Sequence, residues 1–230
     1  MAVPKPIVMI LCAVLACVVT APPARAAAIR GVVLFKGAVD QKKLPVTIDQ
    51  YVCGKDKPAE DLVVNAQRVR SAVVWLQTPP PGASWPSAPV KTEMDQKNCV
   101  FVPRVVLVPA GGTVEFLNSD RLLHNLHSVS KENPSFNRTQ PKGRVIPIAF
   151  SKPEIVRVNC DLHSWMRAWV VVADHPFYAL TNEAGEFSLP SVPPGKYVLQ
   201  IWQESLGVTS REITVGGDDT SVVVELTAPR

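Results

Sequence analysis

Residues 158–172 read VNCDLHSWMRAWVVV, and this stretch sets the first question about the fold. Cys160, His163 and Met166 follow one another with two residues between each, directly before an apolar run that ends at Val172. The apolar residues on both sides predict two β-strands, with the three side chains on the turn that joins them. We therefore ask whether one loop supplies three ligands of a single metal ion.

Short apolar runs separated by turn residues extend along the rest of the chain. Residues 31–35, 72–76, 113–117 and 197–202 read as strands, whereas residues 78–89 are rich in Pro, Gly and Ser and predict a loop. No long helical period, internal repeat or low-complexity tract interrupts the pattern. The sequence predicts an all-β protein with β-sandwich architecture.

The first 26 residues have the features of a signal peptide. Lys5 precedes an apolar stretch at residues 7–20, and Ala24-Arg25-Ala26 forms a small-x-small cleavage site. An uncleaved anchor is the alternative, and a lipoprotein acylated at Cys17 fits the local sequence poorly. We expect a periplasmic or secreted protein with no stable membrane insertion after cleavage.

The charge of the mature chain argues against two classes of partner. Cleavage removes Lys5 and Arg25, so Lys plus Arg falls from 24 to 22 against 20 Asp plus Glu, a net charge of +2. A charge this small does not favour binding to nucleic acid or to an anionic membrane.

Three cysteines stay in the mature chain, at positions 53, 99 and 160. An oxidising compartment favours disulfides, and three thiols leave one unpaired. We expect Cys53 to pair with Cys99, which leaves Cys160 free. A bond to a metal would explain a free thiol in an exported protein, and a buried apolar thiol is the alternative.

The candidate ligands are of unusual types for so short a span. The mature chain has only two methionines, and two further histidines, His124 and His127, follow the predicted strand at 113–117. Two imidazoles, one thiolate and a weak axial thioether describe a blue-copper electron-transfer site, whereas zinc prefers four strong ligands. The candidate ligands are therefore Cys160, His163 and Met166, with either His124 or His127 as the fourth.

This motif resembles that of the cupredoxins. Cys-x-x-His-x-x-Met before an apolar strand, with an upstream His-Asn-x-His, is most similar to the short ligand loop of amicyanin-type proteins, and the glycine turn and strand at 111–116 are similar as well. The resemblance covers about residues 100–173. Residues 29–99 resemble exported cupredoxin-like proteins that are often called methylamine utilisation proteins, a name that does not establish methylamine metabolism for this chain. The resemblance implies a Greek-key β-sandwich over residues 27–175 and one type 1 copper.

The resemblance also implies roles for single residues. Asn125 would hydrogen-bond near the thiolate and tie the two ligand segments together. Leu123 and Ser164 stand where prolines are often found, which puts the stiffness of the ligand loop in question. The resemblance assigns His124 as the upstream ligand, Cys160 as the thiolate, His163 as the second imidazole and Met166 as the axial ligand.

Three further side chains have open interpretations. On an extended chain His127 should face away from His124, so it would bind a second ion or support the ligands from behind. Trp165 is either a core residue or part of an apolar docking patch around an exposed edge of His163. His175, before Pro176, is read as structural.

The C-terminal segment has its own pattern. Residues 181–187, followed by residues 192–197, resemble the carboxypeptidase regulatory-like, or transthyretin-like, β-sandwich, a structural or binding module without catalytic residues. Residues 176–230 are few for an independent core, so we expect this smaller sandwich to pack on the rest of the chain or to borrow a strand from it. A boundary near residue 175 is therefore soft.

The sequence favours an exported blue-copper protein that carries single electrons and is not an enzyme. Its partner would be a redox protein, such as a c-type cytochrome or a dehydrogenase. A periplasmic copper-handling protein and a structural envelope protein with a vestigial site are the alternatives.

Overall fold

The computed structural model describes residues 26–40, 42–85 and 91–228, and strands make up most of them. The prediction of an all-β fold is confirmed. The only helix among the described residues is α1 (Gln50–Cys53), a single turn. No helix in this part of the chain is long and apolar enough to cross a membrane. The expected signal peptide, apart from Ala26, lies outside the described residues.

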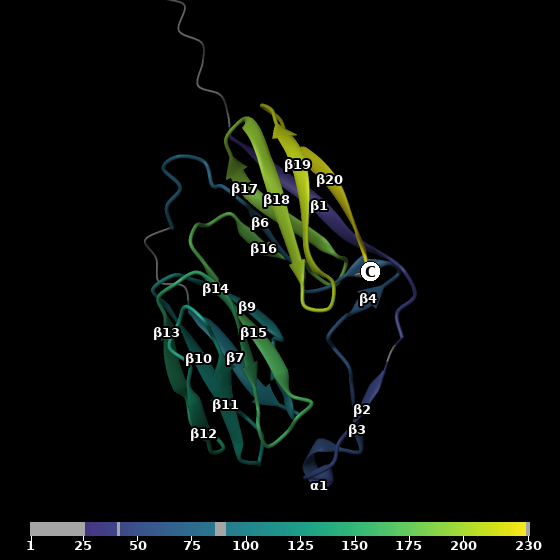
Figure 1. The fold of residues 1–230 in the computed structure, drawn as a ribbon, viewed down its shortest axis with the longest axis vertical. Helices are drawn as coiled ribbons and strands as arrows, with labels where there is room; N and C mark the ends of the chain where they lie inside the picture. Colours follow the sequence, from purple (N-terminus) through teal and green to yellow (C-terminus); the bar gives the residue numbers. More distant parts are fainter. Residues whose placement is uncertain (1–25, 41, 86–90, 229–230) are drawn as a thin grey trace, which may run out of the picture.

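The lower half of the molecule in Figure 1 is a sandwich of two sheets, which we call the ligand sandwich. Its sheets have the strand orders β13-β10-β7-β8 and β12-β11-β14-β15-β9. The first sheet contains β7 (Thr92–Lys97), β8 (Val100–Val102), β10 (Gly112–Asn118) and β13 (Ile146–Phe150). The second contains β9 (Val105–Pro109), β11 (His124–Val129), β12 (Asn137–Gln140), β14 (Glu154–Asn159) and β15 (Arg167–Ala173).

Alternation along these strands forms the core of the ligand sandwich. Val114 and Phe116 of β10 face Val156 and Val158 of β14, and all four side chains are fully buried in one cluster. The intervening residues point outward, as the two-residue period of a strand requires. This packing fixes the ends of β11, β14 and β15, from which the candidate ligands project.

The upper half in Figure 1 is the second sandwich. One sheet has the order β17-β1-β5-β4 with β20 also paired to β1, and the other has the order β16-β6-β18-β19. The N-terminal part of the chain supplies β1 (Ala27–Lys36), β4 (Val64–Asn65), β5 (Arg68–Val69) and β6 (Val73–Leu76). The C-terminal part supplies β16 (Tyr178–Leu180), β17 (Glu186–Val192), β18 (Gly195–Gln203), β19 (Gly207–Val215) and β20 (Thr220–Thr227).

The second sandwich therefore draws on both ends of the chain, across the boundary expected near residue 175. β1 pairs along its length with β20, and β6 lies between β16 and β18. The physical reason is burial: Ile29, Val33, Val74 and Leu76 are fully buried against the apolar side chains of the C-terminal strands. The C-terminal strands alone would leave that apolar surface in water.

A small hairpin extends from the second sandwich along the side of the ligand sandwich (Figure 1). It consists of β2 (Lys43–Pro45), α1 and β3 (Asp56–Pro58), and β2 pairs only with β3. We call residues 43–58 the arm. Its tip is tied to the ligand sandwich by a disulfide between Cys53 and Cys99, with an S–S distance of 2.01 Å, so the predicted pairing is confirmed.

The two sandwiches meet through a compact apolar contact that contains one ion pair. Val73, Val105, Val171 and Trp202 form a buried cluster between them. Beside it, Arg104 of the ligand sandwich contacts Glu204 of the second sandwich at 2.5 Å, with side chains only 13% and 5% exposed. Trp169 donates its indole N–H to the same carboxylate at 2.9 Å.

Candidate metal centre

The candidate ligands come from two neighbouring strands of one sheet. His124 is the first residue of β11, and Cys160 to Met166 form the loop between β14 and β15. The loop is closed by its own backbone: Met166 donates its N–H to the His163 carbonyl at 2.8 Å, and Cys160 donates to the Met166 carbonyl at 3.3 Å. A tight turn between two buried strands therefore positions the loop side chains.

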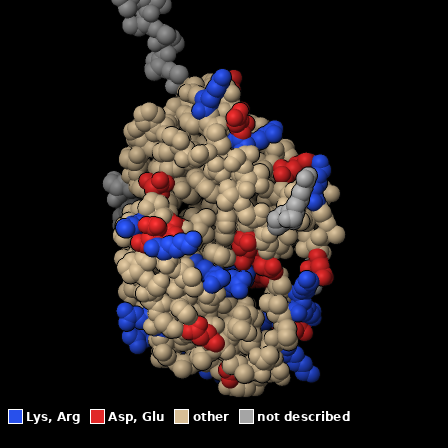
Figure 2. Space-filling view, in the orientation of Figure 1, with Lys and Arg blue, Asp and Glu red and all other residues tan. Residues whose placement is uncertain are grey.

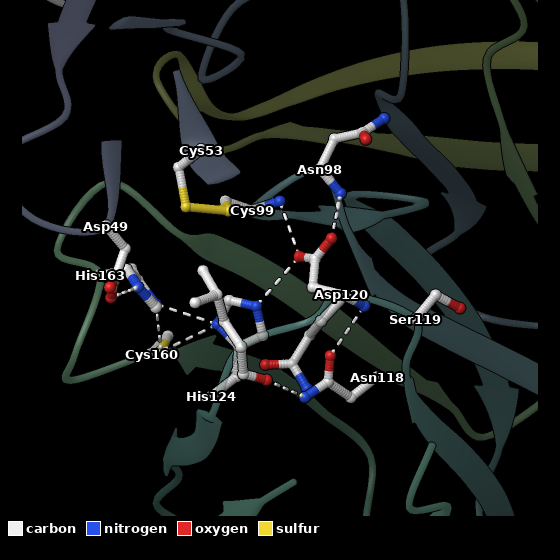
Figure 3. A network of polar contacts seen from close by, with 12 residues as sticks. Asp49, Cys53, Asn98, Cys99, Asn118, Ser119, Asp120, His124, Cys160 and His163 are labelled. Atoms are coloured by element: carbon white, nitrogen blue, oxygen red, sulfur yellow. Dashed lines mark hydrogen bonds and ion pairs between the residues drawn. A yellow bond between two sulfur atoms is a disulfide. The ribbon is translucent and has the colours of Figure 1, made fainter. Parts of the chain in front are cut away.

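Three ligand atoms lie close together in the interior. His124 Nδ1 is 2.9 Å from His163 Nδ1, and the Cys160 Sγ is 3.5 Å from His163 Nδ1 and 3.9 Å from His124 Nδ1. Both rings are fully buried, and Cys160 is 2% exposed. In Figure 3 the two rings and the sulfur point toward one another.

This triangle has the dimensions that one transition-metal ion requires. Metal bonds of about 2.0 Å to nitrogen and about 2.3 Å to sulfur place the ligand atoms of one centre roughly 3–4 Å apart. Two of the three distances fall in that range and the third, 2.9 Å, is just below it, and the group is one of two clusters among the described residues that could hold a metal ion. The second cluster combines Cys99 with Asp120 and His124, but the Cys99 sulfur is bonded to Cys53 and is no thiolate ligand.

Two carboxylates fix the tautomers of the rings. His124 Nε2 is 3.0 Å from an oxygen of Asp120, and His163 Nε2 is 3.1 Å from an oxygen of Asp49. An ionised carboxylate only accepts, so each Nε2 donates, and each Nδ1 lone pair faces the centre. Two lone pairs 2.9 Å apart repel unless a cation, either a proton or a metal ion, lies between them.

The protonation equilibria fit the same conclusion. Burial acts to raise the pKa of the Cys160 thiol, but hydrogen bonds from His124, His163 and the Asn125 N–H outweigh it and lower this pKa to about 6. Burial likewise acts to lower the pKa of His124, yet Asp120 and Cys160 raise it to about 9. The interior therefore favours a thiolate beside a positive charge, which a metal ion supplies in place of the proton.

Asn125 links the two ligand segments. Its backbone N–H donates to Cys160 Sγ at 3.5 Å, and its side-chain oxygen accepts the Asp161 N–H at 2.6 Å. Its amide also donates to the Asp161 carboxylate at 2.9 Å. These contacts are of the kind that the resemblance implied for this residue.

His127 lies away from the triangle. Its Nδ1 is 2.8 Å from Asp161, and its side chain is 42% exposed. It reaches the ligand loop only through Asp161, which also contacts Asn125. His175 is buried in the second sandwich, where its Nε2 bonds to the Leu76 carbonyl.

The prediction that an edge of the His163 ring is exposed is wrong. The ring is fully buried because the arm covers it, with Asp49 against its Nε2 atom. Trp165 is 8% exposed and donates its indole N–H to the Cys99 carbonyl at 2.9 Å, so it packs in the core cluster rather than on an open surface. The arm thus covers the His163 ring, whereas Asp161, Leu162 and Ser164 of the same loop are exposed.

Met166 lies on the same loop, 1% exposed and within the core cluster of the ligand sandwich. The backbone contacts of Met166 to Cys160 and His163 hold it next to both residues. The described contacts join the triangle to its carboxylates but assign no partner to the thioether sulfur. Its role as an axial ligand stays a prediction.

Sequence reasoning missed the two carboxylates. Asp120 stands four residues before His124, and this short spacing was the available signal. Asp49 is 114 residues from His163, and only the pairing of Cys53 with Cys99 hinted that its segment reaches the site.

Comparison with known proteins gives partial matches. Residues 141–223 match the family model described as polysaccharide lyase family 4, domain II, rather than a carboxypeptidase regulatory-like family. This match covers the end of the ligand sandwich and part of the second sandwich. A comparison with curated proteins finds no match.

The similar solved structures include a copper-containing nitrite reductase, a purple cupredoxin and amicyanin variants. A copper-containing nitrite reductase from Thermus scotoductus SA-01 is 23% identical over 42% of this chain and 25% of its own, with a TM-score of 0.35. This chain thus matches about a quarter of the length of that enzyme. A purple cupredoxin from Nitrosopumilus maritimus is 20% identical over 36% of this chain and 100% of its own, at a TM-score of 0.32. A reduced amicyanin variant is 21% identical over 44% of this chain and 98% of its own, with a TM-score of 0.34. At TM-scores this low, the similarities support no inference about what this chain binds.

Proposed function

We propose that this protein is an exported type 1 copper protein that carries single electrons and makes or breaks no bonds itself. The observation that carries the proposal is the buried triangle of His124 Nδ1, His163 Nδ1 and Cys160 Sγ, with sides of 2.9, 3.5 and 3.9 Å. Two imidazoles and a thiolate are the strong ligands of such a centre. Met166, buried on the same loop, is the proposed weak axial ligand.

The chain itself provides what one-electron transfer needs. Copper held there would accept and release one electron by alternating between its cuprous and cupric states. Asp120 and Asp49 hold the imidazoles with their Nδ1 atoms toward the centre. The closed loop and the buried strands keep the ligands in one arrangement and exclude water, so little has to reorganise when the charge changes.

Export to the periplasm or to the outside of the cell is part of the proposal. The disulfide between Cys53 and Cys99 supports an oxidising compartment. On the face in Figure 2, Lys and Arg alternate with Asp and Glu across the middle of the molecule. That mixture supports a protein partner, such as a c-type cytochrome or a dehydrogenase, rather than a polyanion.

The visible absorption spectrum of residues 27–230 after addition of Cu(II) tests the proposal. The expected result is an intense blue band from thiolate-to-copper charge transfer, which Cys160→Ser abolishes. Ser128→Ala, a buried polar residue of the same strand as His124, is the matched control and should keep the band. Tight copper binding without the band would indicate copper handling, and no copper binding would indicate a structural protein.

A further inference from the structure

The arm brings a carboxylate to the candidate copper site from outside the ligand sandwich. Asp49 immediately precedes α1 and adopts a left-handed conformation, with φ 52° and ψ 31°. Asp is one of the few residues that tolerate this region. Its carbonyl accepts the N–H groups of Val52 and Cys53, at 3.0 and 2.9 Å, so the backbone is held as its carboxylate faces His163.

The arm is anchored at its tip and separated from the body nearer its base. Val46 and Cys53 are buried in the core cluster of the ligand sandwich, and the disulfide fixes Cys53 to Cys99. Toward the second sandwich, a cleft of about 640 Å³ separates the arm from the body, with lining residues that include Leu44, Met166 and Leu206. The disulfide and the buried Val46 and Cys53 therefore hold Asp49 over His163, while the base of the arm borders the cleft.

The ion pair between Asp49 and His163 is more buried than an incidental surface contact. The His163 ring is fully buried, and the side chain of Asp49 is only 32% exposed. A buried ring N–H without an acceptor is unfavourable, so His163 depends on this carboxylate for its present orientation. Figure 3 shows the resulting order, in which Asp49 lies beyond His163 and Asp120 lies beyond His124.

We propose that Asp49 is a positioning residue that also closes the site. It holds the Nδ1 atom of His163 toward Cys160, and the arm that carries it keeps solutes away from the ligand cluster. The inference rests on the proposed function and sharpens it, because a closed centre exchanges electrons with a partner while small anions and competing chelators stay out. Because the arm covers the site without any metal, the closure can also be tested on the metal-free protein.

Three variants separate this role from a general loss of stability. Asp49→Ala removes the carboxylate, and Asp49→Asn keeps an oxygen that can accept the ring N–H. Asp56→Ala is the matched control: it lies in β3 of the same arm and contacts Lys43 at 3.2 Å on the surface.

The first readout needs no metal. Among the residues that the structure describes, Cys160 is the only free cysteine, and a protein of residues 27–230 lacks Cys12 and Cys17. We expect Asp49→Ala to react faster than the wild type with an aromatic disulfide reagent that reports free thiols. Asp49→Asn should lie between the two, and Asp56→Ala should match the wild type. Equal rates in all four proteins would overturn the proposed closure.

The second readout uses copper-loaded protein. We expect Asp49→Ala to hold Cu(II) about 10–100-fold more weakly against a chelator, as is usual when the partner of a ligating histidine is lost. Added azide should shift the visible band of Asp49→Ala and leave that of the wild type unchanged. Unchanged affinity and an unchanged response to azide would contradict the positioning role. A wild type without a thiolate-to-copper band would refute the proposed function, while the metal-free labelling would still test the closure.

Discussion

The two sandwiches bury different kinds of side chain. The second sandwich has an almost entirely apolar interior, and its buried polar side chains among the described residues are His175, Thr181 and Gln203. The ligand sandwich buries many more, including Gln96, Asn118, Asp120, His124, Asn125, Gln140 and His163. Burying polar groups costs free energy unless each one has a hydrogen-bond partner. The polar residues are buried mainly in the ligand sandwich, which also contains the candidate metal site.

The polar interior of the ligand sandwich is connected rather than scattered. Gln96 donates to Gln140 at 2.6 Å, Asn118 donates to the Gln140 carbonyl at 2.8 Å, and Asp120 donates its N–H to Asn118 at 3.0 Å. Asp120 then accepts from His124. This chain of contacts holds a ligand in place from a distance, whereas the second sandwich contacts the ligand sandwich through an apolar cluster and the Arg104–Glu204 ion pair.

The largest expected effect concerns the contact between the two halves. Glu204→Ala leaves Arg104 buried without its partner and Trp169 without its acceptor, so we expect a loss of about 3–5 kcal/mol in unfolding free energy. Urea denaturation measures it. Replacing both Arg104 and Glu204 by Met should recover most of the loss. A single variant as stable as the wild type would show that the halves do not depend on this contact.

An apolar deletion in the second sandwich should separate stability from the site. Leu199 of β18 is fully buried in the apolar core, and Leu199→Ala should cost about 2–5 kcal/mol. The visible band of the copper-loaded protein should stay unchanged below the unfolding transition. A shifted band would contradict the separation of roles between the two sandwiches, because it would show that packing in the second sandwich affects the ligands.

Removing a polar side chain from the ligand sandwich should, in contrast, affect copper binding as well as stability. Asn118→Ala removes the acceptor of the Asp120 N–H and the donor to the Leu122 and Gln140 carbonyls, at about 1–3 kcal/mol. We also expect weaker copper binding, because Asp120 positions His124. Competition with a chelator measures the copper affinity. An unaltered affinity would show that this hydrogen-bond network does not position His124.

The smallest effect is expected at the far end of β14. Glu154 accepts N–H groups from Lys131, Glu132 and Asn133 and the hydroxyl of Ser130. Burial acts to raise the pKa of this carboxyl, but the hydrogen bonds prevail and lower it from 4.5 to about 2. The charged form therefore stabilises the fold fully above about pH 4.5, and this contribution disappears as the pH falls toward 2.

Glu154→Gln should thus destabilise the protein by about 1 kcal/mol at pH 7. The difference from the wild type should shrink when unfolding is measured between pH 5 and pH 2. Copper affinity at pH 7 should not change, because the residue lies at the opposite end of β14 from Cys160. A difference that grows on acidification would contradict a lowered pKa for this carboxyl in the folded protein.

Much of this organisation could be predicted from the sequence, and the reasons for the limits are physical. Sequence pattern identified the strand at 113–117 and the two strands that flank the ligand loop, and residue chemistry with the family resemblance identified His124, Cys160 and His163, which the structure brings together. Counting thiols led to the pairing of Cys53 with Cys99. These features depend on local pattern or on the rarity of a residue type.

What the sequence did not reveal depends on contacts between distant segments. β1 pairs in parallel with β20, about 190 residues later in the chain, and no local signal specifies that partner. The contact of Asp49 with His163 is of the same kind, and it covers an edge that was expected to be exposed. An aspartate before a one-turn helix has no pattern that marks it as a neighbour of a ligand.

Anomalous X-ray scattering at the copper edge, from crystals of residues 27–230 loaded with Cu(II), tests the central claim most directly. We predict one strong peak inside the ligand sandwich, at bonding distance from His124 Nδ1, His163 Nδ1 and Cys160 Sγ, and no such peak in Cys160→Ser. A peak at the surface beside His127 and Asp161, or no peak in the loaded wild type, would contradict the assignment of the copper site.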